Sequence, residues 1–184
     1  MELIIIIIDM KRVLSVIFVF CFLIGVVNGQ TITGGVQYSA QDALIELRNN
    51  IPEADFFLTS KNYVDTNHQE NYSSLLKGIT KLNDRTLGLF SDDTYAINYY
   101  NDPKHVWYYD KSGTLINTEI KTSLSYPYRS YKYTPEGELV NMSMRVSENE
   151  TFIFSPLGKL LGHWVNENCY DESGKVIMTR KIVK

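Results

Sequence analysis

Few side chains in this sequence could perform chemistry: the histidines His68, His105 and His163, and the cysteine Cys169. His163 lies six residues before Cys169, across an expected turn, so the two could form a Cys–His nucleophile pair. The sequence shows no nucleophile elbow, no oxyanion glycine cluster and no helix N-terminus behind the cysteine. A hydrolase that uses Cys169 and His163 is therefore a remote alternative, and no residue is assigned as catalytic.

Acidic residues gather at Asp92 and Asp93, with Asp84 and Asp102 nearby, and carboxylates of this kind can bind Ca²⁺. Their spacing is not that of a calcium loop, and the sequence has neither zinc-ligand spacing nor a phosphate-binding loop. We therefore expect no metal site, no cofactor and no enzyme activity.

The composition is that of one globular domain. The chain has 184 residues, a formal net charge of −3 and 13 tyrosines. The charge argues against a nucleic-acid partner, because such a protein needs a basic surface. Tyrosine favours strands, so the composition indicates a β-rich fold.

The N-terminal residues have the pattern of a secretory signal peptide. Two basic residues precede an apolar run of 15 residues, Val13 to Val27, and small residues follow as far as Gly29. We expect residues 1–29 to be cleaved, with Met10 as the natural start. An uncleaved anchor is the alternative, although a membrane span needs ~20 apolar residues. The mature protein would be periplasmic, on the cell surface or extracellular, with no stable membrane insertion.

Cys169 is the only cysteine left after such a cleavage, so an internal disulfide is excluded. We expect it to be a small buried apolar residue. Pairing between two chains is the alternative.

Residues 30–38 are expected to be a flexible linker, and residues 39–184 a single globular domain. Its helical part, 39–84, shows apolar residues at helical spacing, which predicts helices over 39–51 and 71–83. In the remaining part, 85–184, the hydrophobic period changes to two, which indicates strands.

A four-residue turn motif recurs in this second part as Asp110–Gly113, Thr134–Gly137, Ser155–Gly158 and Asp171–Gly174. Its first side chain can accept a hydrogen bond from the turn backbone. Gly113, Gly137, Gly158 and Gly174 would take the left-handed conformation of a G1 bulge, which glycine adopts at little cost. The stretch around 91–94 is a related copy, and it has Thr94 where a glycine would be needed. We expect another turn type there.

An aromatic residue precedes each motif and two apolar residues follow it, so Tyr109 should face Leu115, and Tyr133 should face Leu139. The expected fold is α+β and mostly β. It is an antiparallel meander of four or five G1-bulge hairpins, with one or two N-terminal amphipathic helices packed on one face.

Strict alternation along the strands separates two faces. One is aliphatic, includes Met142 and Met144, and is expected to lie under the helices. The other is aromatic and turns polar further along, at Asn117, Glu119, Asn141, Ser143 and Arg145. The candidate binding residues are its aromatic members: Trp107, Tyr109, Tyr131, Tyr133, Phe152, Phe154 and Trp164. The alternative is that this ladder of rings only stiffens an open sheet.

The stretches "YDKSGTL" and "YDESGKV" resemble the YD repeats of Rhs-type surface proteins and the MORN-variant repeats of antitoxin-like proteins, over about 107–183. The uneven spacing departs from both families. The resemblance implies a non-catalytic scaffold or binding module and assigns no catalytic residue.

Together these features predict an exported, non-catalytic β-hairpin-repeat module that binds a protein or a glycan at or outside the cell envelope. The alternative is a structural or assembly protein of the envelope or surface, in which the sheet edge docks other copies.

Overall fold

The computed structural model describes residues 31–33, 36–52, 73 and 83–184, and the chain divides into two compact units, Met1–Ala40 and Gln41–Lys184. In the first unit, β1 (Thr31–Thr33) and β2 (Val36–Tyr38) pair as an antiparallel hairpin. The expected signal peptide and nearly all of the expected helix at 71–83 lie outside the described residues.

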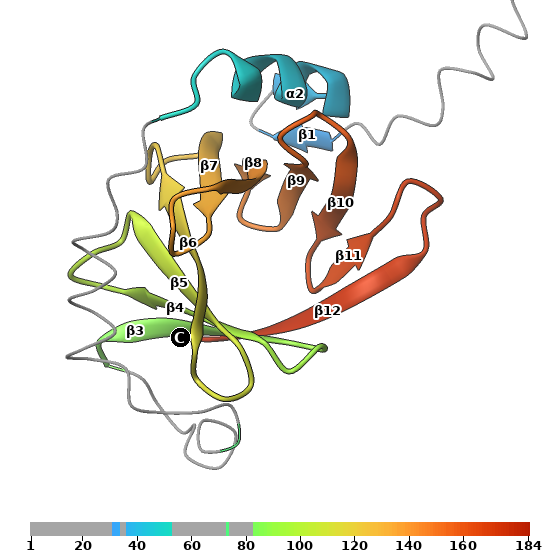
Figure 1. Ribbon diagram of the computed structural model, residues 1–184. Helices are drawn as coiled ribbons and strands as arrows, with labels where there is room; N and C mark the ends of the chain where they lie inside the picture. The colour runs from blue at the N-terminus through green and yellow to red at the C-terminus, as the bar shows by residue number, and fades with distance from the viewer. Residues whose placement is uncertain (1–30, 34–35, 53–72, 74–82) are drawn as a thin grey trace, which may run out of the picture. The chain divides into compact units, whose positions relative to one another are not determined.

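The described part of the second unit contains a closed barrel of ten antiparallel strands (Figure 1). Each strand pairs with its neighbours in sequence, and β12 pairs with β3 to close the barrel. The strands are β3 (Arg85–Phe90), β4 (Tyr95–Tyr99), β5 (His105–Tyr109), β6 (Leu115–Lys121), β7 (Tyr128–Tyr133), β8 (Leu139–Ser147), β9 (Glu150–Phe154), β10 (Leu160–Val165), β11 (Asn168–Tyr170) and β12 (Val176–Val183).

The mostly β fold and the antiparallel meander are therefore confirmed. The expected row of four or five hairpins is wrong as a description of the sheet, because the sheet is closed. The last strand of the barrel, β12, pairs with its first strand, β3. In that pairing Arg180 lies opposite Phe90, and Val183 lies opposite Leu87. Closure removes the exposed edges that an open meander would present to other chains.

The repeated motifs form the turns that sequence predicts. The four glycines have φ angles of 93°, 96°, 87° and 80° at Gly113, Gly137, Gly158 and Gly174. In the first of these turns, the Oδ1 atom of Asp110 accepts hydrogen bonds from the backbone N–H groups of Ser112 and Thr114, at 2.8 and 2.9 Å. Because every second turn of a meander lies at the same end, all four motifs lie at one rim of the barrel.

The turn between β3 and β4 belongs to the same type, contrary to the expectation. The Asp93 N–H donates to the Phe90 carbonyl at 3.2 Å, and the Phe90 N–H donates to the Thr94 carbonyl at 3.0 Å, which is the pattern of the glycine-containing turns. Asp93, with φ 65°, occupies the glycine position. The expectation failed because it placed Thr94 there, and aspartate tolerates the left-handed conformation.

A β-bulge after each motif exchanges the two faces of the following strand. Tyr133 lies opposite Leu139, but Lys132 lies opposite Asn141, so Val140 is an extra residue. Because side chains alternate with a period of two, one extra residue moves all later side chains to the other face. Met142 consequently lies opposite Tyr131.

The face assignments made by strict alternation are therefore wrong beyond the bulges. Met142 and Met144 share the face of the aromatic residues, and both are buried. The polar residues that were expected on the aromatic face lie on the opposite face, which lines a cavity inside the barrel: Asn117, Glu119, Asn141, Ser143 and Arg145.

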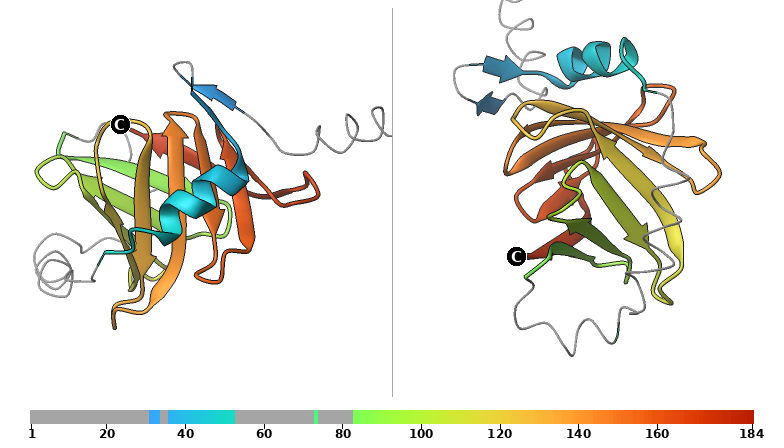
Figure 2. Two further views of the ribbon diagram at one scale, coloured as in Figure 1. Left: turned by 90° about the horizontal axis from the view of Figure 1, so that it is seen from above. Right: turned by 90° about the vertical axis from the view of Figure 1, so that its left-hand side faces the viewer.

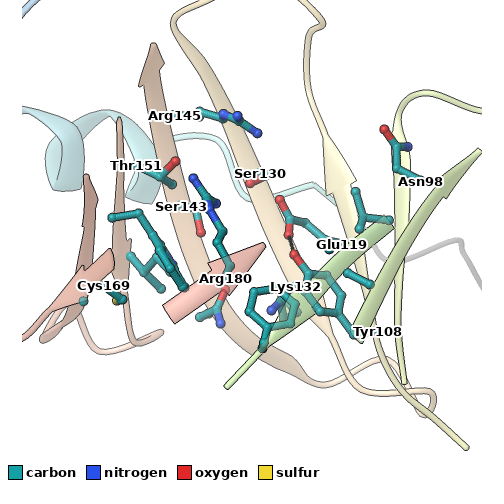
Figure 3. A pocket seen from close by; sticks show the side chains of 18 of the residues that line it. Asn98, Tyr108, Glu119, Ser130, Lys132, Ser143, Arg145, Thr151, Cys169 and Arg180 are labelled. Atoms are coloured by element: carbon teal, nitrogen blue, oxygen red, sulfur yellow. Dashed lines mark hydrogen bonds between the residues drawn. The ribbon is translucent and has the colours of Figure 1, made fainter. Parts of the chain in front are cut away.

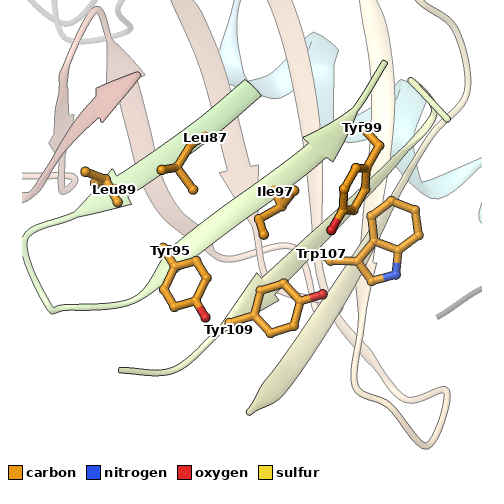
Figure 4. Close-up of a cluster of buried hydrophobic side chains, with 7 residues drawn as sticks. All are labelled: Leu87, Leu89, Tyr95, Ile97, Tyr99, Trp107 and Tyr109. Atoms are coloured by element: carbon orange, nitrogen blue, oxygen red, sulfur yellow. The ribbon is translucent and has the colours of Figure 1, made fainter. Parts of the chain in front are cut away.

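The outer face of the barrel carries a cluster of buried apolar and aromatic side chains. The cluster lies on β3, β4 and β5, and no member is more than 6% exposed (Figure 4). The rings of Tyr95 and Tyr109 stack there with centroids 5.3 Å apart. The cluster consists of Leu87, Leu89, Tyr95, Ile97, Tyr99, Trp107 and Tyr109.

Helix α2 (Ala40–Arg48) begins directly after Ser39, as the capping pattern predicts, and lies over the outer face of the barrel (Figure 2). The Tyr131 hydroxyl donates to the Leu47 carbonyl at 2.9 Å, and the Tyr133 hydroxyl donates to the Pro52 carbonyl at 2.7 Å. The helix therefore covers the aromatic face, whereas strict alternation placed it on an aliphatic one. No helix among the described residues is long and apolar enough to cross a membrane.

Candidate ligand-binding cavity

The barrel encloses a cavity of about 620 Å³, lined by side chains from all ten strands. This volume lies within the usual range for sites that bind small molecules, roughly 300–1,000 Å³. Figure 3 shows that its labelled side chains are mostly polar. The inner face therefore does not form a packed apolar core.

One group of lining residues is held together by its own contacts. Glu119 and Lys132 are cross-strand neighbours, and the Tyr108 hydroxyl donates to Glu119 Oε2 at 2.5 Å (Figure 3). The Lys132 Nζ atom lies 3.4 Å from the centroid of the Tyr108 ring, which is a close cation–π contact. We call Tyr108, Glu119 and Lys132 the acid–base cluster.

The charges of this cluster compensate each other. Burial alone would raise the pKa of Glu119, but the Lys132 charge and hydrogen bonds from Ser130 and Tyr108 hold it below its ordinary value. Burial lowers the pKa of Lys132, against the attraction of Glu119. Burial also raises the pKa of Tyr108 well above its ordinary value, so this phenol is neutral near pH 7. The cluster therefore contains a carboxylate and a phenol that are poor proton donors and acceptors at neutral pH.

A second group lies on β8, β9, β10 and β12, and we call it the open wall: Ser143, Arg145, Thr151, Trp164 and Arg180. The Arg180 guanidinium carbon lies 4.5 Å from the Trp164 ring centroid. One of its N–H groups donates to the Asn166 carbonyl at 3.0 Å. The stacked ring and this hydrogen bond fix the position of the guanidinium.

Arg145 reaches the far end of the same wall. Its guanidinium donates to the Ser147 and Glu148 carbonyls, at 3.3 and 2.7 Å, and lies near the Tyr128 hydroxyl at 3.4 Å. Burial lowers the pKa of Arg180, and the nearby positive charge of Arg145 lowers it further. The open wall therefore concentrates positive charge.

The interior as a whole is cationic, although the chain carries a net charge of −3. Lys121, Lys132, Arg145 and Arg180 line it, and Glu119 is the one carboxylate among the partly buried lining residues that the structure describes. Within the part of the chain that the structure describes, no ion pair joins these four cations to a carboxylate. Buried charges are usually paired, so this cavity is suited to an anion.

The seven aromatic residues predicted to bind a ligand do not form an exposed stripe. Six lie on the outer face and are at most 3% exposed: Trp107, Tyr109, Tyr131, Tyr133, Phe152 and Phe154. Trp164 alone among them lines the cavity. A binding role for the six stays a prediction, and their burial directs attention to the inner face.

Cys169 and His163 point to opposite faces of the sheet. Cys169 lies opposite Trp164 and lines the cavity, whereas the neighbouring His163 turns outward, 2.7 Å from Glu150 Oε1 and stacked on the Phe152 ring at 4.3 Å. Burial raises the pKa of the Cys169 thiol, so it is a weak nucleophile. The two residues are therefore not arranged as a nucleophile and its base.

Sequence reasoning missed four polar or charged residues that line the cavity: Lys121, Lys132, Thr151 and Arg180. A local signal exists in "LINTEIK", where Asn117, Glu119 and Lys121 alternate with Thr118 and Ile120 and mark a polar face. Among the described residues, no group of three or more His, Cys, Asp and Glu side chains is arranged to hold a metal ion.

The fold and the cavity define a closed antiparallel barrel with a polar, cationic interior. Comparison with known protein families, curated proteins and solved structures finds no match for this chain. The resemblance to YD and MORN-variant repeats therefore stays a prediction.

Proposed function

We propose that this protein is an exported, non-catalytic binding module that encloses a small anionic ligand inside its barrel. The main support for the proposal is the excess of positive charge inside the barrel: among the described residues, four partly buried cations line the cavity and Glu119 is the one partly buried carboxylate beside them. An anion in the cavity would supply the missing counter-charge at a site with little competing water. Export is proposed from the apolar run that precedes Gly29.

Several features favour binding over catalysis. Among the described residues that line the cavity, Cys169 is not paired with His163 as a base, since the two face opposite ways. Glu119 is already engaged by Tyr108 and faces Lys132 across the strands. The volume of about 620 Å³ suits a small molecule or a short piece of a larger one, such as a glycan.

The proposal can be tested with 8-anilinonaphthalene-1-sulfonate and its uncharged relative N-phenyl-1-naphthylamine, which share an aromatic body. We expect the folded protein to bind the sulfonate in a saturable way and more tightly than the neutral dye. Arg180→Gln should weaken sulfonate binding about tenfold to a hundredfold, because a hydrogen bond to a charged group is lost.

Arg129→Gln is the matched control. Arg129 is on β7 and does not line the cavity, so this change should leave dye affinity unaltered. Equal affinity for the two dyes, or an Arg180→Gln protein that binds the sulfonate as the unmodified protein does, would contradict the proposal.

A further inference from the structure

We propose that the enclosed anion is an acidic sugar, a hydroxyl-rich ring that carries a carboxylate. This inference rests on the proposed function and adds the chemical class of the ligand. It is drawn from the open wall, where charged and uncharged polar groups lie side by side.

The strand register places three members of the open wall in one row. Arg145 lies opposite Thr151, and Thr151 lies opposite Trp164 on the next strand. Ser143 is on the same face of β8 as Arg145. A ligand lying along this row would meet a guanidinium and two hydroxyl groups.

Arg180 supplies a prepared site for the carboxylate. Trp164 and the Asn166 carbonyl hold its guanidinium in place, and the Asn166 contact uses one of its five N–H donors. The fork of an arginine matches the two oxygens of a carboxylate. Arg145, close enough to influence Arg180 electrostatically, adds positive charge at the end of the row.

The uncharged polar side chains of the cavity favour binding of a sugar acid over binding of an aliphatic acid. Ser143 and Thr151 are 7% and 9% exposed, and their hydroxyls make no side-chain hydrogen bond with the described residues. The Asn117 and Asn141 amides, also on the inner face, likewise make none there. An alkyl chain would cover these groups without satisfying them, whereas sugar hydroxyls both donate and accept hydrogen bonds.

The test is displacement of bound anilinonaphthalene sulfonate from the folded, unmodified protein. The competitors are digalacturonate and diglucuronate, the neutral disaccharide galactobiose, and the aliphatic carboxylate octanoate. We expect at least one of the two uronates to displace the dye at concentrations about tenfold or more below those needed for galactobiose or octanoate.

Two variants locate the site. Thr151→Val and Ser143→Ala should each weaken uronate binding about threefold to tenfold, the effect of one ordinary hydrogen bond, and should leave octanoate unaffected. Thr118→Val is the control and should leave uronate binding unaltered. It also removes a buried hydroxyl, but from the outer face, where Thr118 lies opposite Trp107.

The two proposals fail in different ways. If octanoate displaces the dye as well as the uronates do, or if no sugar acid displaces it, the sugar assignment is overturned while anion binding stands. If galactobiose competes equally, the carboxylate has no role and the assignment is also overturned. If the sulfonate dye itself does not bind, the proposed function fails first.

Discussion

The outer and inner faces of the same ten strands have opposite character. On the outer face Trp107 is fully buried in a cluster of seven apolar and aromatic residues, and α2 covers Tyr131. On the inner face Trp164 borders a cavity of about 620 Å³ and lies against the Arg180 guanidinium. The outer face therefore supplies the stability of the fold, and the inner face is available for a ligand.

A local feature of the chain determines which residues face outward and which face the cavity. The bulges after the glycine turns shift the alternation by one, so Glu119 and Arg145 turn inward and Met142 turns outward. Without the shift, the polar residues of β6 and β8 would lie among the aromatic rings of the outer face. The cost of burying them there would be large.

Replacing each of the two tryptophans should change stability and binding more than any other substitution proposed below. Trp107→Ala should lower the free energy of unfolding by about 3–5 kcal/mol, the usual cost of removing a large ring from a packed core. Trp164→Ala should cost less, because its ring borders a cavity, and should impair binding of the sulfonate dye instead. Urea denaturation and dye titration of both variants measure this. A larger stability loss for Trp164→Ala would reverse the roles assigned to the faces.

The next effect concerns Glu119. The pKa of Glu119 is lower in the folded protein than in the unfolded chain. The ionised carboxylate therefore stabilises the fold at pH values above its unfolded pKa, and this stabilisation is lost as the pH falls through its folded pKa. Glu119→Gln should remove that acid-side slope and lower stability by about 1–3 kcal/mol near pH 7. The same change should strengthen binding of the sulfonate dye, because it leaves the inner cations without their carboxylate.

Urea denaturation at pH 3–7 and dye titration at pH 7 give the two readings for Glu119→Gln. Glu136→Gln, in an exposed turn, is the control. Weaker dye binding by the Glu119→Gln protein would show that the interior is not the cationic site described above.

The smallest of the three effects tests the turns that set the register. Gly174 has φ +80°, and a Cβ placed there would meet no atom within 4 Å. Gly174→Ala should therefore cost only the left-handed backbone penalty, about 1–2 kcal/mol, with no steric contribution. Thermal denaturation measures it, and no change in stability would contradict the turn assignment.

The sequence predicted the turns because their chemistry is local. The first residue of each motif and its final glycine are sufficient to specify the turn, and the Tyr109–Leu115 and Tyr133–Leu139 pairs follow directly from it. Helix α2 was also predicted, since its apolar residues repeat at helical spacing.

The sequence did not predict closure or the cavity. Closure depends on β12 pairing with β3, about ninety residues earlier, and no local pattern encodes that contact. The cavity was missed because alternation was continued through the bulges, which assigned Asn117, Asn141 and Ser143 to the aromatic face. Counting the bulged residue in each hairpin would have separated the polar and apolar faces.

Quenching of tryptophan fluorescence by iodide is the sharpest test of the contrast between the two faces, because iodide is an anion that a cationic cavity should attract. Two variants isolate the reporters: Trp107→Phe leaves Trp164 on the inner face, and Trp164→Phe leaves Trp107 on the outer face. We predict that iodide quenches Trp164 much more strongly than Trp107, and that high salt reduces the difference. Equal quenching of the two, or stronger quenching of Trp107, would contradict an open cationic interior behind a closed apolar exterior.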